Sequence, residues 1–184
     1  MTHSWAEHRG GGRSVGPRMD SPRRRPWASG QPSLMAPGAP CRAVGQKLVA
    51  LIDEATARSE TFRRLVAEVD QTDGIVYVAE GECGHDVRAC LTNLITLAGP
   101  NRVLRILVDP HKLDRELMGS IGHELQHAVE VLSQRGIRNT FAMIMFYYTT
   151  VGLHGGRFET RAAIEAGNAV RTELRNTEAR EHRK

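Results

Sequence analysis

The stretch "IGHELQHAVEVL", residues 121–132, constrains the chain most, because its apolar residues recur at the period of an amphipathic helix. On a helical wheel with His123 at zero, His127 lies at about 40° and Glu130 at about −20°. The apolar side chains gather on the opposite side of the wheel: Met118, Ile121, Leu125, Ala128 and Leu132. We therefore expect a helix over about residues 114–133 whose two histidines lie on a face that it does not need for its own packing.

Apolar periodicity elsewhere predicts the elements around this helix. Two helices should precede it, the first starting near Gln46 and the second capped by Ser59. Three short apolar segments, "GIVYVAE", "CLTNLITLAGP" and "NRVLRILVD", predict strands, with "AGPN" as the hairpin turn between the last two. Further helices are expected over about residues 139–150 and 158–180. Helices, then a small and mainly antiparallel sheet, then helices predict an α+β fold.

Composition separates a tail from one domain. Residues 1–44 hold the clusters "RGGGR", "SPRRRP" and "APGAP" without periodic apolar residues, so we expect a disordered basic tail ahead of a domain over residues 45–184. The first 30 residues carry six arginines against two acidic residues, which accounts for the whole formal charge of +4. The rest of the chain is therefore neutral, and no nucleic-acid partner is expected.

No apolar segment approaches the length needed to cross a bilayer, and the arginines near Met1 have no apolar segment of a signal peptide behind them. These features predict no membrane partner and, by default, a cytoplasmic protein. Three cysteines are too few for a disulfide scaffold. Cys83 and Cys90 could close a small loop or stay reduced, and both alternatives are open. The sequence does not indicate an oligomeric state.

The histidine spacing fits zinc chemistry, because two imidazoles one helical turn apart can both reach one ion at about 2.0 to 2.1 Å. Glu124 follows His123 at the edge of the same face. A carboxylate there can act on a metal-bound water as a general base without binding the metal itself. We therefore expect His123 and His127 to be zinc ligands and Glu124 to be the catalytic base.

A catalytic zinc needs a third protein ligand, and three residues are candidates. Glu130 lies about 7.5 Å along the helix axis from the midpoint of the histidines, and its side chain should lean back toward His127. It therefore suits a hydrogen bond to that histidine better than a bond to the metal. His154, in the segment "GLHGG", would require a long spacer, and most loop histidines are simply solvated.

Glu159 is the strongest candidate. It comes at the head of a stripe of small or apolar residues on the final helix: Ala163, Ala166 and Val170. A carboxylate at the head of such a stripe is costly to bury unless it is paired or binds a metal, and the small residues allow a close approach to the histidine helix. The alternative is that Glu159 only interacts favourably with the N-terminus of its own helix.

The stretch "HELQH" matches the HExxH signature of zincin metallopeptidases, and "GHELQHAVE" with the later "FETRAAIEAG" resembles the gluzincin type. The chain is also similar to short bacterial proteins that combine "HELQHA" with a downstream "FET". The resemblance implies a zincin-like fold, with a small antiparallel or mixed sheet packed on the active-site helix. It also implies a zinc ligand on a downstream helix, which points to Glu159, although the spacer is longer here than in the simplest gluzincins.

These observations predict a zinc-dependent peptidase that acts on peptide or protein substrates. The donors available to stabilise a developing oxyanion are Tyr147, Tyr148, His154 and Arg157, and their spacing favours none of them. The alternative is a non-catalytic metal-binding or protein-interaction domain of zincin shape, because the chain has little material for a second wall of a protease cleft. The presence of Glu124 favours the enzyme, since a purely structural metal site needs no base.

Overall fold

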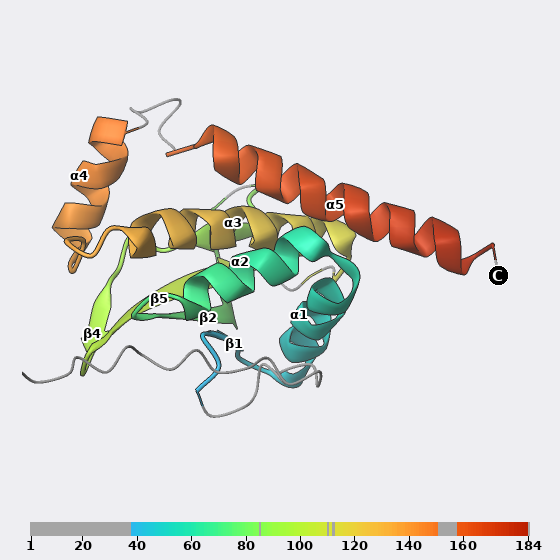
Figure 1. The fold of residues 1–184 in the computed structure, drawn as a ribbon, viewed down its shortest axis with the longest axis horizontal. Helices are drawn as coiled ribbons and strands as arrows, with labels where there is room; N and C mark the ends of the chain where they lie inside the picture. The colour runs from blue at the N-terminus through green and yellow to red at the C-terminus, as the bar shows by residue number, and fades with distance from the viewer. Residues whose placement is uncertain (1–37, 85, 110, 112, 151–157, 184) are drawn as a thin grey trace, which may run out of the picture. The chain divides into compact units, whose positions relative to one another are not determined.

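A computed structural model of the chain describes residues 38–84, 86–109, 111, 113–150 and 158–183. Five helices and five strands lie in this described part (Figure 1). In chain order they are β1 (Cys41–Ala43), α1 (Gln46–Arg58), α2 (Glu60–Asp70), β2 (Gly74–Glu80), β3 (Ala89–Leu91), β4 (Thr96–Ala98), β5 (Asn101–Val108), α3 (Arg115–Ser133), α4 (Thr140–Thr150) and α5 (Arg161–Glu181). The α+β class predicted from the sequence is confirmed.

The sheet has the order β1-β2-β5-β3, and β4 also pairs with β5. Strands β1 and β5 run parallel to β2, whereas β3 and β4 run antiparallel to β5. The sheet is therefore mixed rather than mainly antiparallel. The segment expected as one strand, "CLTNLITLAGP", is divided into β3 and β4, because Ile95 turns into the core between them while Leu94 is exposed.

The predicted hairpin between the last two strands is confirmed. Strands β4 and β5 pair antiparallel, with Ala98 opposite Asn101, and Gly99 and Pro100 form the turn. Gly99 has a φ of 60°, which a residue without Cβ adopts at no steric cost. This turn sets the start of β5, which runs through the middle of the sheet.

Helices α2 and α3 contact the sheet, and α5 lies along the outer side of α3 (Figure 1). Side chains of α3 that point toward the sheet and α2 are fully buried, among them Leu117, Ile121 and Leu125. Ser59 caps α2 by accepting a hydrogen bond from the backbone N–H of Phe62, as its position before the helix predicted. Helix α3 is thus held between the sheet and α5.

Glycines allow α3 and α5 to approach closely. A Cβ on Gly122 of α3 would lie 2.8 Å from Val170 Cγ2, and a Cβ on Gly167 of α5 would lie 3.0 Å from the carbonyl oxygen of Gly119. The same Cβ of Gly167 would lie 3.1 Å from the Cβ of His123. The expected close approach of the final helix is therefore present, and the histidine face of α3 is partly covered by α5.

The folded unit begins earlier than the sequence pattern predicted. Cys41–Ala43 forms β1, which pairs with β2 although we assigned residues 1–44 to the tail. A strand of three residues is too short to show a period in the sequence, and its neighbours Pro40 and Gly45 conceal it further. Residues 1–37 of the expected tail lie outside the described residues.

Arg102 is a fully buried charge that ties the start of β5 to the end of α3. It forms an ion pair with Asp73 and donates hydrogen bonds to four carbonyl oxygens, those of Val131, Leu132, Gln134 and Ile137. The last carbonyls of a helix have no partner within it, so Arg102 replaces partners that the helix cannot provide. No pattern of residues around Arg102 indicated that this arginine would be buried.

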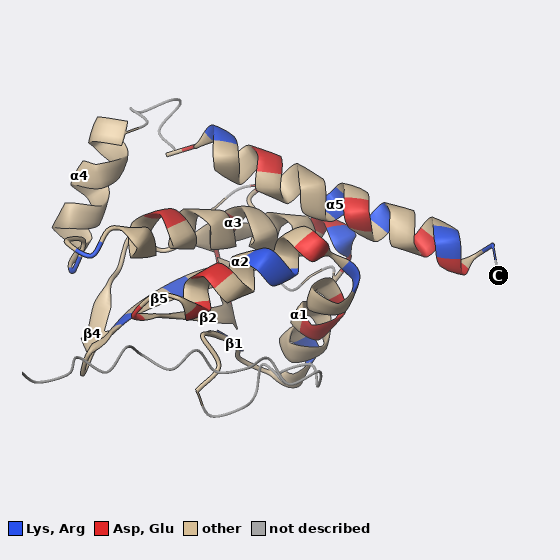
Figure 2. Cartoon of the chain, in the orientation of Figure 1, with Lys and Arg blue, Asp and Glu red and all other residues tan. Residues whose placement is uncertain are grey.

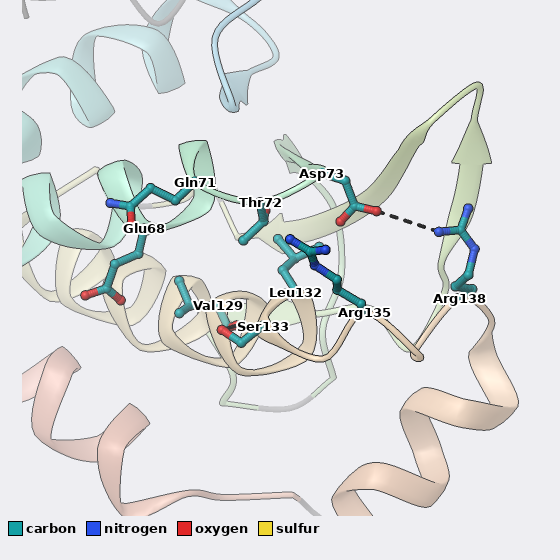
Figure 3. Close-up of a pocket in the computed structure, with 9 residues that line it drawn as sticks. All are labelled: Glu68, Gln71, Thr72, Asp73, Val129, Leu132, Ser133, Arg135 and Arg138. Atoms are coloured by element: carbon teal, nitrogen blue, oxygen red, sulfur yellow. Dashed lines mark hydrogen bonds and ion pairs between the residues drawn. The ribbon is translucent and has the colours of Figure 1, made fainter. Parts of the chain in front are cut away.

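A hollow of about 740 Å³ lies beside this arrangement, between the C-terminal ends of α2 and α3 (Figure 3). Its charged groups include Asp73 and Arg138, which pair at 3.7 Å. Neither histidine of the "HELQH" stretch lines this hollow. Its size therefore does not mark it as the place of the expected chemistry.

Charged residues are unevenly distributed over the helices. Acidic and basic residues alternate along α5, whereas α4 carries neither kind (Figure 2). Phe141, Met145 and Tyr148 of α4 are exposed.

None of the described helices combines the length and the apolar character needed to span a membrane.

Candidate metal centre

His123, His127 and Glu159 come together although the end of α3 and the whole of α4 lie between His127 and Glu159 in the chain. One ligand atom from each of the three lies within 4.8 Å of those of the others. His123 Nε2 lies 3.1 Å from Glu159 Oε2. These three residues, which we call the His–His–Glu triad, are the residues that the sequence analysis selected as metal ligands.

Helix α3 positions the two histidines. Asp114 caps the helix by accepting a hydrogen bond from the backbone N–H of Leu117, and the helix continues unbroken to Ser133. The imidazole rings of His123 and His127 lie edge to face with their centroids 4.8 Å apart. His127 is buried and His123 is half-buried, so both rings are held away from bulk water.

Glu159 was expected at the start of the final helix, but in the structure it is not part of a helix. Helix α5 begins at Arg161 with Thr160 as its N-cap, and Glu159 lies in the extended segment before it. Thr160 marks the N-terminal limit of α5, because its side chain caps the helix by accepting a hydrogen bond from the backbone N–H of Ala163. The expected start at residue 158 was therefore early, and Glu159 reaches His123 from outside the helix.

Glu130 bonds to His127 rather than joining the triad. Its Oε2 lies 3.1 Å from His127 Nδ1, and its Oε1 accepts a hydrogen bond of 2.7 Å from the hydroxyl of Thr160. Burial by itself would raise the pKa of Glu130, but the hydrogen bonds from His127 and Thr160 hold it below its ordinary value. An ionised Glu130 favours a proton on Nδ1 of His127, which leaves Nε2 available to a metal.

Burial also determines the charge of His123. The pKa of this imidazole is lowered, mainly by burial and then by the proximity of His127, while Glu159 opposes the change. A lowered pKa keeps the ring neutral at neutral pH. Neutral imidazole is the form that binds metal ions, so His123 needs little proton release before it can act as a ligand.

Glu124 lies beside the triad without belonging to it. Its Oε1 is 3.9 Å from His123 Nε2, and its Oε2 accepts a hydrogen bond of 2.7 Å from the backbone N–H of Leu91 in β3. Burial raises the pKa of Glu124 to about 7, although His127 and the Leu91 bond oppose that rise. A carboxylate with a pKa near 7 can both take up and release a proton at neutral pH.

The four candidate oxyanion donors differ in whether their donor groups are already engaged. The hydroxyl of Tyr147 donates to the backbone carbonyl of His127, and the ring of Tyr147 stacks on Phe158 at 5.2 Å. Tyr147 therefore supports the site rather than offering a donor. Tyr148 is half exposed and contacts Phe158 edge on. His154 and Arg157 lie outside the described residues.

A pocket of about 240 Å³ opens beside the triad. Glu124, His127 and Glu159 line it, together with Cys83 and Cys90, which form a disulfide. The disulfide decides the alternative that the cysteine spacing had left open. Other lining residues come from the edge of the sheet, from α4 and from the segment before α5: Val87, Leu91, Asn93, Met143, Tyr147 and Phe158.

Three contributors to the site were missed in the sequence. The contribution of the Leu91 backbone N–H could not be predicted, because every residue except proline carries this group and the side chain does not show where it is used. Phe158 and Thr160 did have one, since they flank Glu159 in the "FET" stretch on which the resemblance depends. In the structure Phe158 lines the pocket and Thr160 binds Glu130, so all three residues of that stretch belong to the site.

The donor set fits a zinc ion. Two imidazole nitrogens and one carboxylate oxygen are the ligands of many catalytic zinc sites, in which the fourth position is left to water or substrate. The pocket lined by His127 and Glu159 opens beside the triad, and Glu124 also lines it. No protein-family profile, curated protein or solved structure was found to match this chain. The chemistry of the site is therefore what bears on the function of this protein.

Proposed function

We propose that this protein is a zinc-dependent peptidase, with His123, His127 and Glu159 as metal ligands and Glu124 as general base. The observation that supports it most is the position of Glu124. A half-buried carboxylate with a raised pKa lies beside the His–His–Glu triad, which offers three ligand atoms without it. Strongly shifted pKa values beside a possible metal site are typical of catalytic groups.

A bound zinc ion would supply a Lewis acid that polarises the substrate carbonyl and makes water easier to deprotonate. Glu124 would take a proton from that water as its oxygen adds to the carbonyl carbon of the peptide bond. The same carboxyl would then deliver the proton to the amide nitrogen as the carbon–nitrogen bond breaks. The products are a carboxylic acid and an amine, and Glu124 returns to its starting state.

A second function has one observation in its favour. The bond from the Leu91 N–H to Glu124 gives this carboxylate a structural use, because it fastens the edge strand to α3. A non-catalytic metal-binding domain could retain Glu124 for that purpose alone. The two functions differ in whether the carboxylate must ionise and carry a proton.

Glu124→Gln separates the two functions. Glutamine can still accept the hydrogen bond from Leu91 but cannot act as a base, so the fold and the bound zinc should persist. We expect hydrolysis of denatured casein to fall by a factor of about 100 or more, the scale of general-base loss. Zinc content is measured by mass spectrometry on the purified full chain, and hydrolysis by release of soluble peptides.

The matched control is Glu165→Gln, the same change at an exposed position of α5 that pairs with Arg161 at the surface. It should leave both zinc content and hydrolysis unchanged. Equal hydrolysis by wild type and Glu124→Gln would exclude the peptidase mechanism. Bound zinc without hydrolysis by either protein would favour the non-catalytic domain, and a wild type without zinc would exclude both.

A further inference from the structure

Thr160 stands between the two parts of the triad. It follows Glu159 directly in the chain, and its hydroxyl donates a hydrogen bond of 2.7 Å to Glu130 Oε1. The other oxygen of the same carboxylate lies 3.1 Å from His127 Nδ1. One hydroxyl thus connects the segment that carries Glu159 to the helix that carries His127.

The direction of these hydrogen bonds is determined by what each group can donate. The hydroxyl oxygen of Thr160 accepts from the backbone N–H of Ala163, so its single proton is available for Glu130. The two oxygens of the Glu130 carboxylate are acceptors, and Oε2 lies 3.1 Å from His127 Nδ1, so this contact is a hydrogen bond when the ring carries its proton on Nδ1. The chain of bonds therefore runs from the N-terminus of α5 through Thr160 and Glu130 to His127.

Each member of this chain is held from more than one side. Half-buried Glu130 has both carboxylate oxygens engaged, and the backbone carbonyl of His127 accepts from Tyr147. Thr160 also begins α5, which packs tightly on α3 through Gly167 and Gly122. Loss of the hydroxyl would remove one of the hydrogen bonds that hold the Glu130 carboxylate and would remove the side-chain link between Glu130 and the segment that carries Glu159.

We infer that Thr160 is a positioning residue that couples the two arms of the metal site. Its hydroxyl sets the orientation of His127 through Glu130 and, through the chain, the place of Glu159. The inference rests on the proposed function only for the identity of the bound metal, zinc. The orientation of His127 can be measured without any metal.

The test compares Thr160→Val with Thr160→Ser in the full chain. Valine keeps the shape of the side chain and removes the hydroxyl, whereas serine keeps a hydroxyl that can both donate and accept. Zinc affinity, measured against a competing chelator, should fall about tenfold in Thr160→Val, the lower end of the range for hydrogen-bond partners of ligating histidines. Thr160→Ser should restore it to within about twofold of wild type. Thr160→Ala serves as a second variant should valine prevent folding.

Thr160 is also the N-cap of α5, so Thr160→Val would weaken this helix even if Thr160 had no effect on the metal site. Removal of the cap of another helix therefore provides the control. Ser59 caps α2 and, among the described residues, does not bond to the triad or to Glu130. Ser59→Ala should lower the midpoint of thermal unfolding and leave zinc affinity within twofold of wild type. A similar loss of zinc affinity in Ser59→Ala and Thr160→Val would reduce the effect to general destabilisation and overturn the inference.

The second readout is nitrogen NMR of the histidine rings in metal-free protein. Wild type and Thr160→Ser should show His127 with its proton on Nδ1, and Thr160→Val should show loss or exchange broadening of that proton. This result would support the coupling even in a protein that fails to bind zinc, and then only the proposed function would be excluded. An unchanged Nδ1 proton together with unchanged zinc affinity in Thr160→Val would overturn the inference.

Discussion

Glu159 and Glu130 both direct a carboxylate toward the histidines, but only Glu159 belongs to the His–His–Glu triad. Glu159→Gln should therefore lower zinc affinity by more than about 100-fold, because it removes the carboxylate that we propose as the third ligand. Glu130→Gln should cost about 10- to 100-fold, since it only weakens the orientation of His127. Chelator competition on both variants measures the order. A larger loss in Glu130→Gln would place the third ligand on α3 and contradict the proposed site.

Glu124 gives the metal-free protein a defined pH dependence. Its pKa is about 7 in the folded chain against an ordinary value of 4.5, so the folded state holds more protons than the unfolded state between these values. The free energy of unfolding must therefore fall as the pH rises from about 4.5 to about 7. Below pH 4.5 both states are protonated and the contribution of burial is no longer visible.

Glu124→Gln removes this titration and keeps the acceptor for Leu91. In the presence of a chelator, the variant should be more stable than wild type at pH 8, by about 3 kcal/mol for a pKa difference of this size. At pH 4 the two proteins should differ little. Urea unfolding at both pH values checks the expectation, and a difference that does not change with pH would show that burial does not raise this pKa.

At the scale of the elements, the packing of α5 on α3 holds the triad together. Gly167→Val would bring a side chain against the carbonyl of Gly119 and the Cβ of His123, where a Cβ alone already lies at 3.0 and 3.1 Å. We expect the free energy of unfolding to fall by about 2 kcal/mol, the typical cost of overpacking. Zinc affinity should fall with it, because His123 must move.

The control is Gly136→Val, since no atom lies within 4 Å of a Cβ built at Gly136. Urea unfolding and zinc titration should show this second variant close to wild type in both respects. If Gly167→Val lowers stability but leaves zinc affinity unchanged, the helices can separate without moving His123, and the close approach would be a matter of stability alone.

For the whole molecule, buried Arg102 joins the sheet to the helix that carries the histidines. Arg102→Met would remove the buried ion pair with Asp73 and the hydrogen bonds from Arg102 to four carbonyl oxygens, of which those of Leu132 and Ile137 have no other donor among the hydrogen bonds of the described residues outside the helices and strands. We expect the free energy of unfolding to fall by about 3 kcal/mol, because buried acceptors lose hydrogen bonds to a charge. The measurement is urea unfolding of the full chain.

Arg138→Met provides the comparison. Arg138 is half exposed and lies 3.7 Å from the same Asp73, so its loss should change stability by no more than about 0.5 kcal/mol. Equal effects of the two substitutions would mean that the bonds from Arg102 to the end of α3 contribute nothing beyond a surface ion pair.

Local elements could be predicted because their signals lie within a few residues. Strand β2 covers the expected "GIVYVAE", Ser59 caps α2, and α3 starts one residue after its expected Asp114. A helical hydrogen bond joins residues four apart, and a strand alternates with a period of two, so both leave a pattern in the chain itself. The same reason allowed His123, His127 and Glu124 to be placed on neighbouring faces of one helix.

Contacts across the chain left much weaker signals. The parallel pairing of β2 with β5, the bond from Leu91 to Glu124 and the burial of Arg102 each join residues about 30 positions apart. The disulfide adds a pairing that the spacing of Cys83 and Cys90 permitted but did not require. Such contacts depend on which surfaces pack together, and short-range patterns do not record that choice.

The sequence by itself determined the helix of residues 121–132, with its two histidines one turn apart and a glutamate beside them. Only the tertiary structure decided that Glu159 completes the group, because this depends on α5 packing against α3 through residues without side chains. The small residues of the final helix were visible in the sequence, but the sequence did not show that they pack against α3. A helix sets its own period through bonds between near neighbours, whereas a site built from two segments exists only where the folded core brings them together.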